Sequence, residues 1–236
     1  GQGGTYLDNV ISLLQASRAQ DISHQGKPVD KNTWQMPAYM VNAYYDPLSN
    51  SINFPAGILQ APLYDVDAPS AQNLGGIGYV IAHEISHAFD NSGSKYDKNG
   101  NAADWWTAED YAAFQKLCDK VVALYDGVEV IPGVTCNGAL TITENIADLG
   151  AMACVLQLEG QAEEPDYKTV FEGLASTWCF TTNRDTYAYL AQVDYHAPSK
   201  LRVNRVLQNF AEFYETYDIQ PEDGMYLDPA DRVQIW

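Results

Sequence analysis

The stretch from Ile81 to Asp90, Ile-Ala-His-Glu-Ile-Ser-His-Ala-Phe-Asp, contains the pattern H-E-x-x-H. Residues four apart share one face of a helix, so His83 and His87 present two imidazoles to one point, as half of a tetrahedral zinc site does. Glu84 is placed to act as general base on a water held there. The apolar run from Ile77 to Ala82 indicates a buried helix, and buried ionisable side chains need partners. A chance pentapeptide with histidines satisfied by core contacts is the alternative interpretation.

The composition is that of a globular protein. The chain has 236 residues, 46% of them hydrophobic and 19% charged, enough for a sizeable core in one domain or two small ones. A net charge of −18 with only 13 Lys and Arg argues against nucleic acid or an anionic membrane surface as partner. The first residues do not resemble a signal peptide, and no apolar run approaches the length of a membrane span, so we expect no span in this chain. The cysteines lack a C-x-x-C pattern and are predicted to be mostly buried thiols: Cys118, Cys136, Cys154 and Cys179.

Periodicity predicts a mainly helical chain with a small β-sheet. Helices are expected at 8–18, where the pattern is amphipathic, in the H-E-x-x-H stretch, after Thr107 as N-cap, at 170–180 and at 201–213. Strands are expected at 41–45 and 51–55, paired as a hairpin or sheet edge. The first is either simply a strand, or an edge strand that offers its main chain and the Asn42 amide to an extended peptide.

A second motif, Glu144-Asn145-Ile146-Ala147-Asp148, places two carboxylates four residues apart on one helix face. Zinc bound to two histidines needs a third protein ligand, and a carboxylate from another helix is a standard solution, which Glu144 would provide. Asp148, and likewise Asp90, could accept a hydrogen bond from a ligand histidine and set its tautomer. Alternatively, the motif is only the acidic first turn of a helix capped by Thr143. The nearby H-E-x-x-H pattern favours the ligand interpretation.

His196 is the remaining histidine of interest, since His24 is isolated. It could be a third zinc ligand, a donor to the transition state or a surface residue. Because Glu144 already fills the ligand role, we favour a donor to the developing oxyanion. Arg202 is one of few cations and could hold a peptide carbonyl or carboxylate.

These residues together resemble the catalytic region of the neprilysin family of zinc metallopeptidases, and the resemblance covers nearly the whole chain. The motifs that carry it are Asn42-Ala43-Tyr44-Tyr45, Phe54-Pro55-Ala56-Gly57-Ile58-Leu59-Gln60, Gly75-Gly76-Ile77-Gly78, His83-Glu84-Ile85-Ser86-His87, Trp105-Trp106, Asn137-Gly138-Ala139-Leu140, Glu144-Asn145-Ile146-Ala147-Asp148, His196-Ala197-Pro198 and Arg202-Val203-Asn204.

The resemblance implies a thermolysin-like zincin catalytic domain over residues 1–236 that holds one Zn²⁺ per chain. It implies that the zinc ligands are His83, His87 and Glu144, that Glu84 is the base, and that Asp148 supports the site from behind the ligands. It further implies His196 as transition-state stabiliser and Asn42, Ala43 and Arg202 as residues that bind substrate main chain. A weaker implication is an apolar side-chain pocket formed by Ile58, Leu63, Val80 and Trp178.

Some features depart from the family pattern. Gly150-Ala151 follows the E-N-x-x-D motif where the family often has Gly-Gly, and Arg205 stands where Gly is common. The chain ends Val233-Gln234-Ile235-Trp236, without the C-x-x-W of animal members, which favours a bacterial-type member. Its location is then expected to be cytoplasmic or secreted, with the cytoplasm preferred. Family enzymes are much longer, so we expect this chain to be a C-terminal fragment without their N-terminal helical domain.

The sequence therefore predicts a zinc-dependent endopeptidase that acts on peptides, with the attacking water activated by Glu84. The alternative is a catalytically inactive peptide-binding fragment of such an enzyme. Without a covering domain, the cleft is expected to be open and the chain to self-associate or to need the missing domain.

Overall fold

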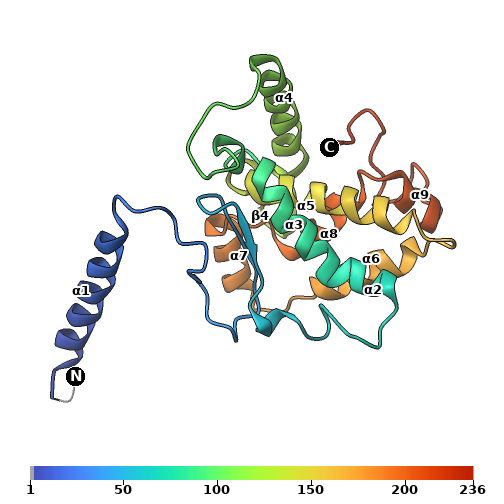
Figure 1. Cartoon of the computed structure of the whole chain (residues 1–236). Coiled ribbons are helices and arrows are strands. Elements are labelled where there is room, and N and C mark those ends of the chain that lie inside the picture. Colours follow the sequence, from blue (N-terminus) through green and yellow to red (C-terminus); the bar gives the residue numbers. More distant parts are fainter. Residues whose placement is uncertain (1–2, 236) are drawn as a thin grey trace. The chain divides into compact units, whose positions relative to one another are not determined.

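The computed structural model describes residues 3–235, and the chain separates into two compact units, one up to Thr33 and one from Trp34 onward (Figure 1). The first unit contains one helix and the second contains all the strands and the remaining helices. The site residues predicted from the sequence all belong to the second unit.

Helix α1 (Tyr6–His24) forms the first unit and is capped at its N-terminus by Thr5. The Thr5 hydroxyl accepts a hydrogen bond from the Asp8 backbone N–H at 3.2 Å, and the Asp8 carboxylate accepts one from the Thr5 N–H at 3.0 Å. The predicted helix at 8–18 is confirmed and is longer than expected. None of its residues is buried, and Leu13 is 71% exposed, because this unit offers α1 no second element to pack against.

The second unit is mostly helical, with two separate two-stranded antiparallel sheets. Its helices are α2 (Ser70–Asn73), α3 (Tyr79–Ser86), α4 (Ala108–Tyr125), α5 (Gly138–Glu159), α6 (Tyr167–Thr177), α7 (Arg184–Val193), α8 (Ser199–Leu207) and α9 (Ala211–Tyr217). Its strands are β1 (Tyr44–Asp46), β2 (Ser51–Asn53), β3 (Glu129–Ile131) and β4 (Val134–Thr135). The predicted fold class, mainly α with a small amount of sheet, is confirmed.

Helix α5 is the centre of this unit, and α3 packs across it (Figure 1). One face of α5 contributes Ile146 and Leu149 to a core shared with α4. The next turns contribute Met152 and Val155 to a second core shared with α3, α6 and α8. All four of these side chains are fully buried, so α5 is held on both sides and can position polar groups accurately.

Two glycines let α3 approach its neighbours. The chain enters α3 through an irregular turn, Leu74–Gly78, in which Gly76 has non-helical backbone angles. A Cβ at Gly75 would collide with the carbonyl oxygen of Val170, and one at Gly76 with that of Leu63. Only glycine fits where two backbones come this close, so these residues set how deeply α3 is seated.

Helix α5 contradicts the expectation that no apolar stretch of the sequence approaches the length of a membrane span. With 22 residues and a mean hydropathy of 1.3 in its most apolar window, it is long and apolar enough to cross a membrane. However, 67% of that window is buried inside the protein, and the helix carries the buried carboxylates Glu144 and Asp148. These features fit the core helix of a globular domain.

The predicted hairpin is present but shorter than expected. Strand β1 pairs with β2 with Tyr44 opposite Asn53 and Asp46 opposite Ser51. The expected boundaries 41–45 and 51–55 are therefore wrong by up to three residues, and Asn42 and Ala43 precede the strand. Asp46 belongs to β1 because it pairs with Ser51, and its carboxylate accepts hydrogen bonds from the Leu48 N–H and the Ser49 hydroxyl in the turn that follows.

The helix boundaries agree with the sequence in part. Thr107 caps α4 as predicted, with its hydroxyl accepting from the Asp110 N–H at 3.1 Å. Thr143 caps nothing, since α5 begins at Gly138 with Asn137 as its N-cap. The expected helix at 201–213 is two helices, α8 and α9. The Asn209 side-chain amide donates a hydrogen bond to the Arg205 carbonyl oxygen at 2.6 Å, and this oxygen is the acceptor that the Asn209 backbone N–H would need in a continuing helix. The helix expected at 170–180 is α6.

The cysteines also differ from expectation. All four are free thiols, but only Cys118 and Cys136 are buried, while Cys154 and Cys179 are exposed. The prediction of mostly buried thiols is therefore wrong for two of the four.

Candidate metal centre and active site

The two histidines of the H-E-x-x-H pattern meet as predicted. His83 lies in the last turn of α3, and His87 begins the 3-10 turn that follows (His87–Phe89). Their Nε2 atoms are 3.0 Å apart, and the rings stand edge to face at 85°. The pattern therefore brings two nitrogen ligands to one point at the end of the helix.

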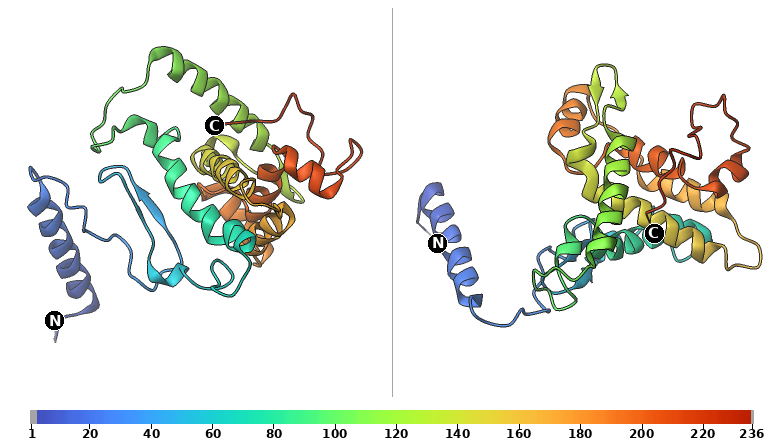
Figure 2. Two further views of the ribbon diagram at one scale, coloured as in Figure 1. Left: turned by 45° about the vertical axis from the view of Figure 1, so that its right-hand side comes forward. Right: turned by 90° about the horizontal axis from the view of Figure 1, so that it is seen from above.

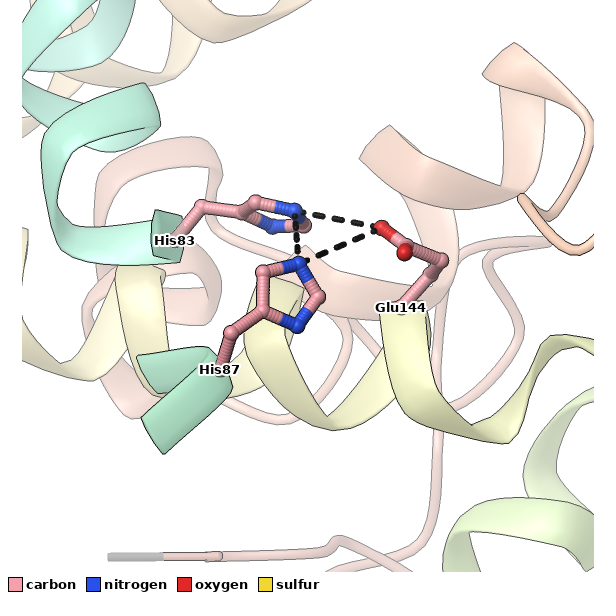
Figure 3. A group of neighbouring side chains, drawn as sticks. All are labelled: His83, His87 and Glu144. Atoms are coloured by element: carbon pink, nitrogen blue, oxygen red, sulfur yellow. Dashed lines mark hydrogen bonds and ion pairs between the residues drawn. The ribbon is translucent and has the colours of Figure 1, made fainter. Parts of the chain in front are cut away.

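Glu144 completes the group from the central helix α5 (Figure 3). Its Oε2 atom lies 3.1 Å from Nε2 of His83 and 3.7 Å from Nε2 of His87. The ligand atoms of these three residues all lie within 4.8 Å of one another, and both His83 and Glu144 are buried. Packing of α3 on α5 is what unites residues about sixty positions apart in the chain.

Two further carboxylates fix the orientation of the histidine rings. Nδ1 of His83 lies 2.8 Å from Oδ1 of Asp148, and Nδ1 of His87 lies 2.7 Å from Oδ2 of Asp90. A carboxylate only accepts, so each of these contacts favours the tautomer with the proton on Nδ1. In a neutral imidazole the other nitrogen is then a bare lone pair.

When both imidazoles are neutral, two nitrogen lone pairs and a carboxylate oxygen therefore point at one another with no donor among them. Buried acceptors in such an arrangement are costly unless a proton or a metal cation lies between them. Two imidazoles, each with a carboxylate at its Nδ1 atom, and one carboxylate are the donor set of a catalytic zinc site that keeps one position open. The residues present thus fit Zn²⁺.

The pKa shifts of the site residues also favour a bound cation. Burial opposes charge on His83, but the neighbouring carboxylates of Asp148 and Glu144 favour its protonated form and raise its pKa to about 9. Burial also opposes charge on Glu144, yet the neighbouring histidines lower its pKa to about 2. Both shifts mean that positive charge is favoured where the three ligand atoms meet, which is what a divalent cation supplies.

Glu84 lies beside the ligands and lines the same cavity as they do. It is only 6% exposed, and this burial raises the pKa of its carboxyl group above the usual value. A carboxylate with a raised pKa is suited to take up a proton and to return it.

His196 approaches from the loop between α7 and α8. Its Nε2 atom lies 3.4 Å from Oε2 of Glu144, and its Nδ1 lies 2.8 Å from Oδ1 of Asp194. The backbone N–H of His196 donates to the same Asp194 oxygen at 2.9 Å. The ring is thus held with Nε2 facing the ligand group.

Arg202 is buried and contacts other side chains of the protein, whereas the sequence predicts a contact with the substrate. Its Nε and Nη2 atoms each donate to Asp148 at 2.7 Å, and its guanidinium lies 3.9 Å from the centre of the Trp178 ring. Asp148 therefore links Arg202 to His83, and the charge of Arg202 lowers the pKa of this buried carboxyl group. Arg202 also lines the cavity, so both a supporting role and the expected contact with substrate are open to it.

One cavity of about 680 Å³ contains nearly all the residues predicted from the sequence. Its lining includes the ligands and Glu84, the expected main-chain contacts and the expected apolar pocket: His83, His87, Glu144, Glu84, His196, Asn42, Ala43, Arg202, Ile58, Leu63, Val80 and Trp178. Asp148 is absent from this lining because it lies fully buried behind His83.

Asp194 is the site residue that the sequence analysis missed. It lies two residues before His196, and a D-x-H spacing outside a helix allows such a hydrogen bond. That signal was present in the sequence but is short and common, so it gains meaning only from the geometry.

The fold and the converging ligands define a class: a mainly helical domain of the thermolysin-like zincin type. Within that class, the chain belongs to peptidase family M13, whose model matches residues 42–233. The resemblance to the neprilysin family seen in the sequence is thereby confirmed.

The chain is 44% identical over 233 residues to a neutral endopeptidase of Lactococcus lactis subsp. cremoris, a match covering 99% of this chain and 37% of that protein. It is 33% identical to Neprilysin-3 of Drosophila melanogaster, over 98% of this chain and 31% of that protein. It thus spans about a third of the length of these relatives.

Two solved structures agree in fold. The crystal structure of PEPO from Lactobacillus rhamnosis HN001 matches 100% of this chain and 38% of its own, with a TM-score of 0.91 and 41% identity. The zinc metalloprotease Zmp1 of Mycobacterium tuberculosis, solved with an inhibitor, matches 93% of this chain and 36% of its own, with a TM-score of 0.87 and 38% identity.

Proposed function

We propose that this chain is the catalytic part of a zinc-dependent endopeptidase that hydrolyses peptide bonds in peptides. The observation that carries the proposal is the convergence of His83, His87 and Glu144 in one cavity with the carboxylate of Glu84. Membership of family M13, with relatives named neutral endopeptidase and neprilysin, supports it.

In the proposed mechanism, His83, His87 and Glu144 would hold one Zn²⁺. When bound there, zinc supplies Lewis-acid chemistry, polarising the scissile carbonyl and making a water molecule more acidic. Glu84 takes the proton of the attacking water and then delivers it to the leaving amine. Its burial suits it to both steps, because its raised pKa brings the carboxyl group closer to the pH at which it works.

His196 is proposed to donate from Nε2 to the oxyanion that forms on the carbonyl. Since Nδ1 is engaged with Asp194, this donation requires the ring to carry both protons. Asp194 would then hold the ring in place and balance its charge. Such a donor acts mainly on the transition state.

The substrate is proposed to lie along the chain before β1, where Asn42 and Ala43 line the cavity. Within residues 3–235, β1 pairs with β2 alone, so its other edge is open to an extended peptide. Ile58, Leu63, Val80 and Trp178 would receive an apolar side chain next to the scissile bond.

The second candidate is a peptide-binding fragment without catalysis. The intact ligand set and Glu84 favour the enzyme.

Cleavage of an internally quenched peptide by the zinc-loaded chain tests the proposal. Glu84→Gln keeps the size and polarity of the side chain but removes the base, so turnover should fall by about 10²–10⁴-fold while zinc remains bound. Glu109→Gln, an exposed substitution on α4, is the matched control and should cleave normally. Chelation should stop cleavage, and added Zn²⁺ should restore it.

Each outcome has a distinct meaning. Equal turnover by wild type and Glu84→Gln would contradict the mechanism. Peptide binding with no cleavage by the zinc-loaded wild type would support the non-catalytic alternative.

A further inference from the structure

The metal centre has apolar space on both sides along α3. Val80 lies about one turn before His83 and belongs to the predicted apolar pocket. Phe89 lies two residues after His87, at the opposite end, and lines a separate cavity of about 460 Å³. The rings of Tyr45, Phe89, Tyr96 and Trp105 line this second cavity, which we call the aromatic groove.

The aromatic groove adjoins the cavity of the metal centre. Tyr45 and Tyr96 line both, and Tyr45 belongs to β1, which also contributes Tyr44 to the lining of the metal-centre cavity. The β1–β2 hairpin lies beside α3 (Figure 2), so an extended peptide on the open edge of β1 would run parallel or antiparallel to the direction from Val80 to Phe89.

The rings of the groove are held in place by the fold. The Tyr45 hydroxyl donates to Oδ1 of Asn50 at 3.1 Å. Trp105 contacts Phe89 edge to face at 6.5 Å and Trp106 at 5.1 Å between ring centres. Trp106 in turn lies 5.2 Å from Phe114, a buried core residue.

These rings nevertheless keep much of their surface exposed. Phe89 is 42% exposed and Trp105 is 45% exposed. Fixed aromatic surface at the edge of a cleft offers large apolar contact at little cost in side-chain entropy.

From this arrangement we infer that the aromatic groove is a second specificity subsite, which takes an aromatic or large aliphatic side chain of the peptide. The inference rests on the proposed peptidase function. The pocket around Val80 would select the residue on one side of the scissile bond, and the aromatic groove a residue on the other side. Trp105 is then a specificity-determining residue, although it lies outside both the H-E-x-x-H and the E-N-x-x-D motif.

The test uses the full chain and a set of internally quenched peptides of one parent sequence. Each of the three positions on either side of the cleaved bond is made Gly, Leu or Phe in turn, and mass spectrometry locates the cleaved bond. Wild type should prefer Phe or Leu to Gly by about tenfold or more in kcat/KM at one position on each side. Trp105→Ala should abolish the preference on one side only, and Val80→Ala the preference on the other.

Two controls separate selectivity from folding. Trp105→Phe should retain the preference, because an aromatic ring remains. Tyr111→Ala removes an exposed aromatic ring of α4 outside the groove and should change nothing. Equal losses for every peptide in Trp105→Ala would overturn the inference, since a structural defect does not discriminate between side chains.

A binding measurement distinguishes failure of the groove from failure of the proposed function. Fluorescence anisotropy of labelled Phe and Gly peptides is followed with Glu84→Gln, with and without Trp105→Ala. Binding that depends on Trp105 without cleavage by wild type would retain the groove and reject catalysis. Cleavage without any Trp105-dependent preference would retain catalysis and reject the groove.

Discussion

At the scale of single residues, the protonation of two nitrogen atoms determines whether the site can bind a metal. Asp90 accepts from Nδ1 of His87, so Nε2 is left as a lone pair directed at Glu144. The other Asp90 oxygen accepts from the N–H groups of Ser92 and Gly93, which fixes the carboxylate itself. Ligand geometry here is thus set by a residue that does not touch the metal position.

Substituting Asp90→Asn should weaken zinc binding without removing a ligand. An amide can keep the contacts to Ser92 and Gly93 through oxygen, but its NH₂ group then faces Nδ1 of His87 and favours the tautomer with Nε2 protonated. We expect zinc affinity to fall by about 10–100-fold, measured by competition with a chromophoric chelator. Asp194→Asn is the paired control, because Asp194 orients a histidine outside the ligand set and should leave zinc affinity unchanged. Equal losses in both variants would refute the argument from tautomers.

His196→Ala tests a donor that acts in the transition state. Because its bond to the oxyanion strengthens as the reaction proceeds, kcat should fall more than KM rises. Steady-state kinetics on the quenched peptide measure the two constants separately. A large rise in KM with kcat unchanged would instead make His196 a residue that binds the ground state.

At the scale of secondary-structure elements, the site depends on how closely α3 approaches α5. The Tyr79 hydroxyl donates to the Asp148 carbonyl at 3.2 Å, and Tyr79 is fully buried between the two helices. The glycines at the entry to α3 let that helix pass the backbones of α6 and of the loop containing Leu63. Neither glycine has a side chain, yet both affect where His83 lies.

Gly75→Ala should destabilise the protein because its methyl group would meet the Val170 carbonyl oxygen. Overpacking of this kind typically costs about 1–3 kcal/mol of unfolding free energy. Gly224→Ala meets no atom within 4 Å and should change it by less than about 0.5 kcal/mol. Urea unfolding of both variants, followed by circular dichroism, gives the comparison. A Gly75→Ala variant as stable as wild type would show that α3 can shift to make room.

At the scale of the whole chain, metal binding should couple two helices that come from distant parts of the sequence. His83 and His87 belong to α3 and its following turn, and Glu144 belongs to α5. Any ligand that binds only the folded state stabilises it, by about 2.7 kcal/mol when its free concentration is a hundred times Kd. Some apolar side chains stay exposed, such as Tyr39 at 82% and Val66 at 78%. Such surface fits the expected self-association of this chain, which stays a prediction.

Removal of zinc should therefore lower the melting temperature, and restoring it should raise the temperature again. Differential scanning fluorimetry with chelator and then with excess Zn²⁺ measures the shift. His83→Ala should show almost no shift, because a principal ligand is missing. If His83→Ala responds to Zn²⁺ as wild type does, the stabilising metal is bound elsewhere.

The sequence by itself determined the class of site and most of its members. H-E-x-x-H and E-N-x-x-D are local patterns, and helical periodicity alone places their side chains on common faces. The same local rules identified the Thr107 cap, since a cap depends only on neighbouring residues. Family M13 could likewise be recognised from motifs in series.

Only the tertiary structure decided the features that depend on packing between distant segments. The pairing of Asp148 with both His83 and Arg202, and of His196 with Asp194, follows from where α5, α8 and the loop before it come to lie. The aromatic groove joins rings from β1, from the turn after α3 and from the loop before α4, and no local pattern unites them. Local spacing determines which residues share an element's face, whereas contacts between elements depend on the packing of the whole core.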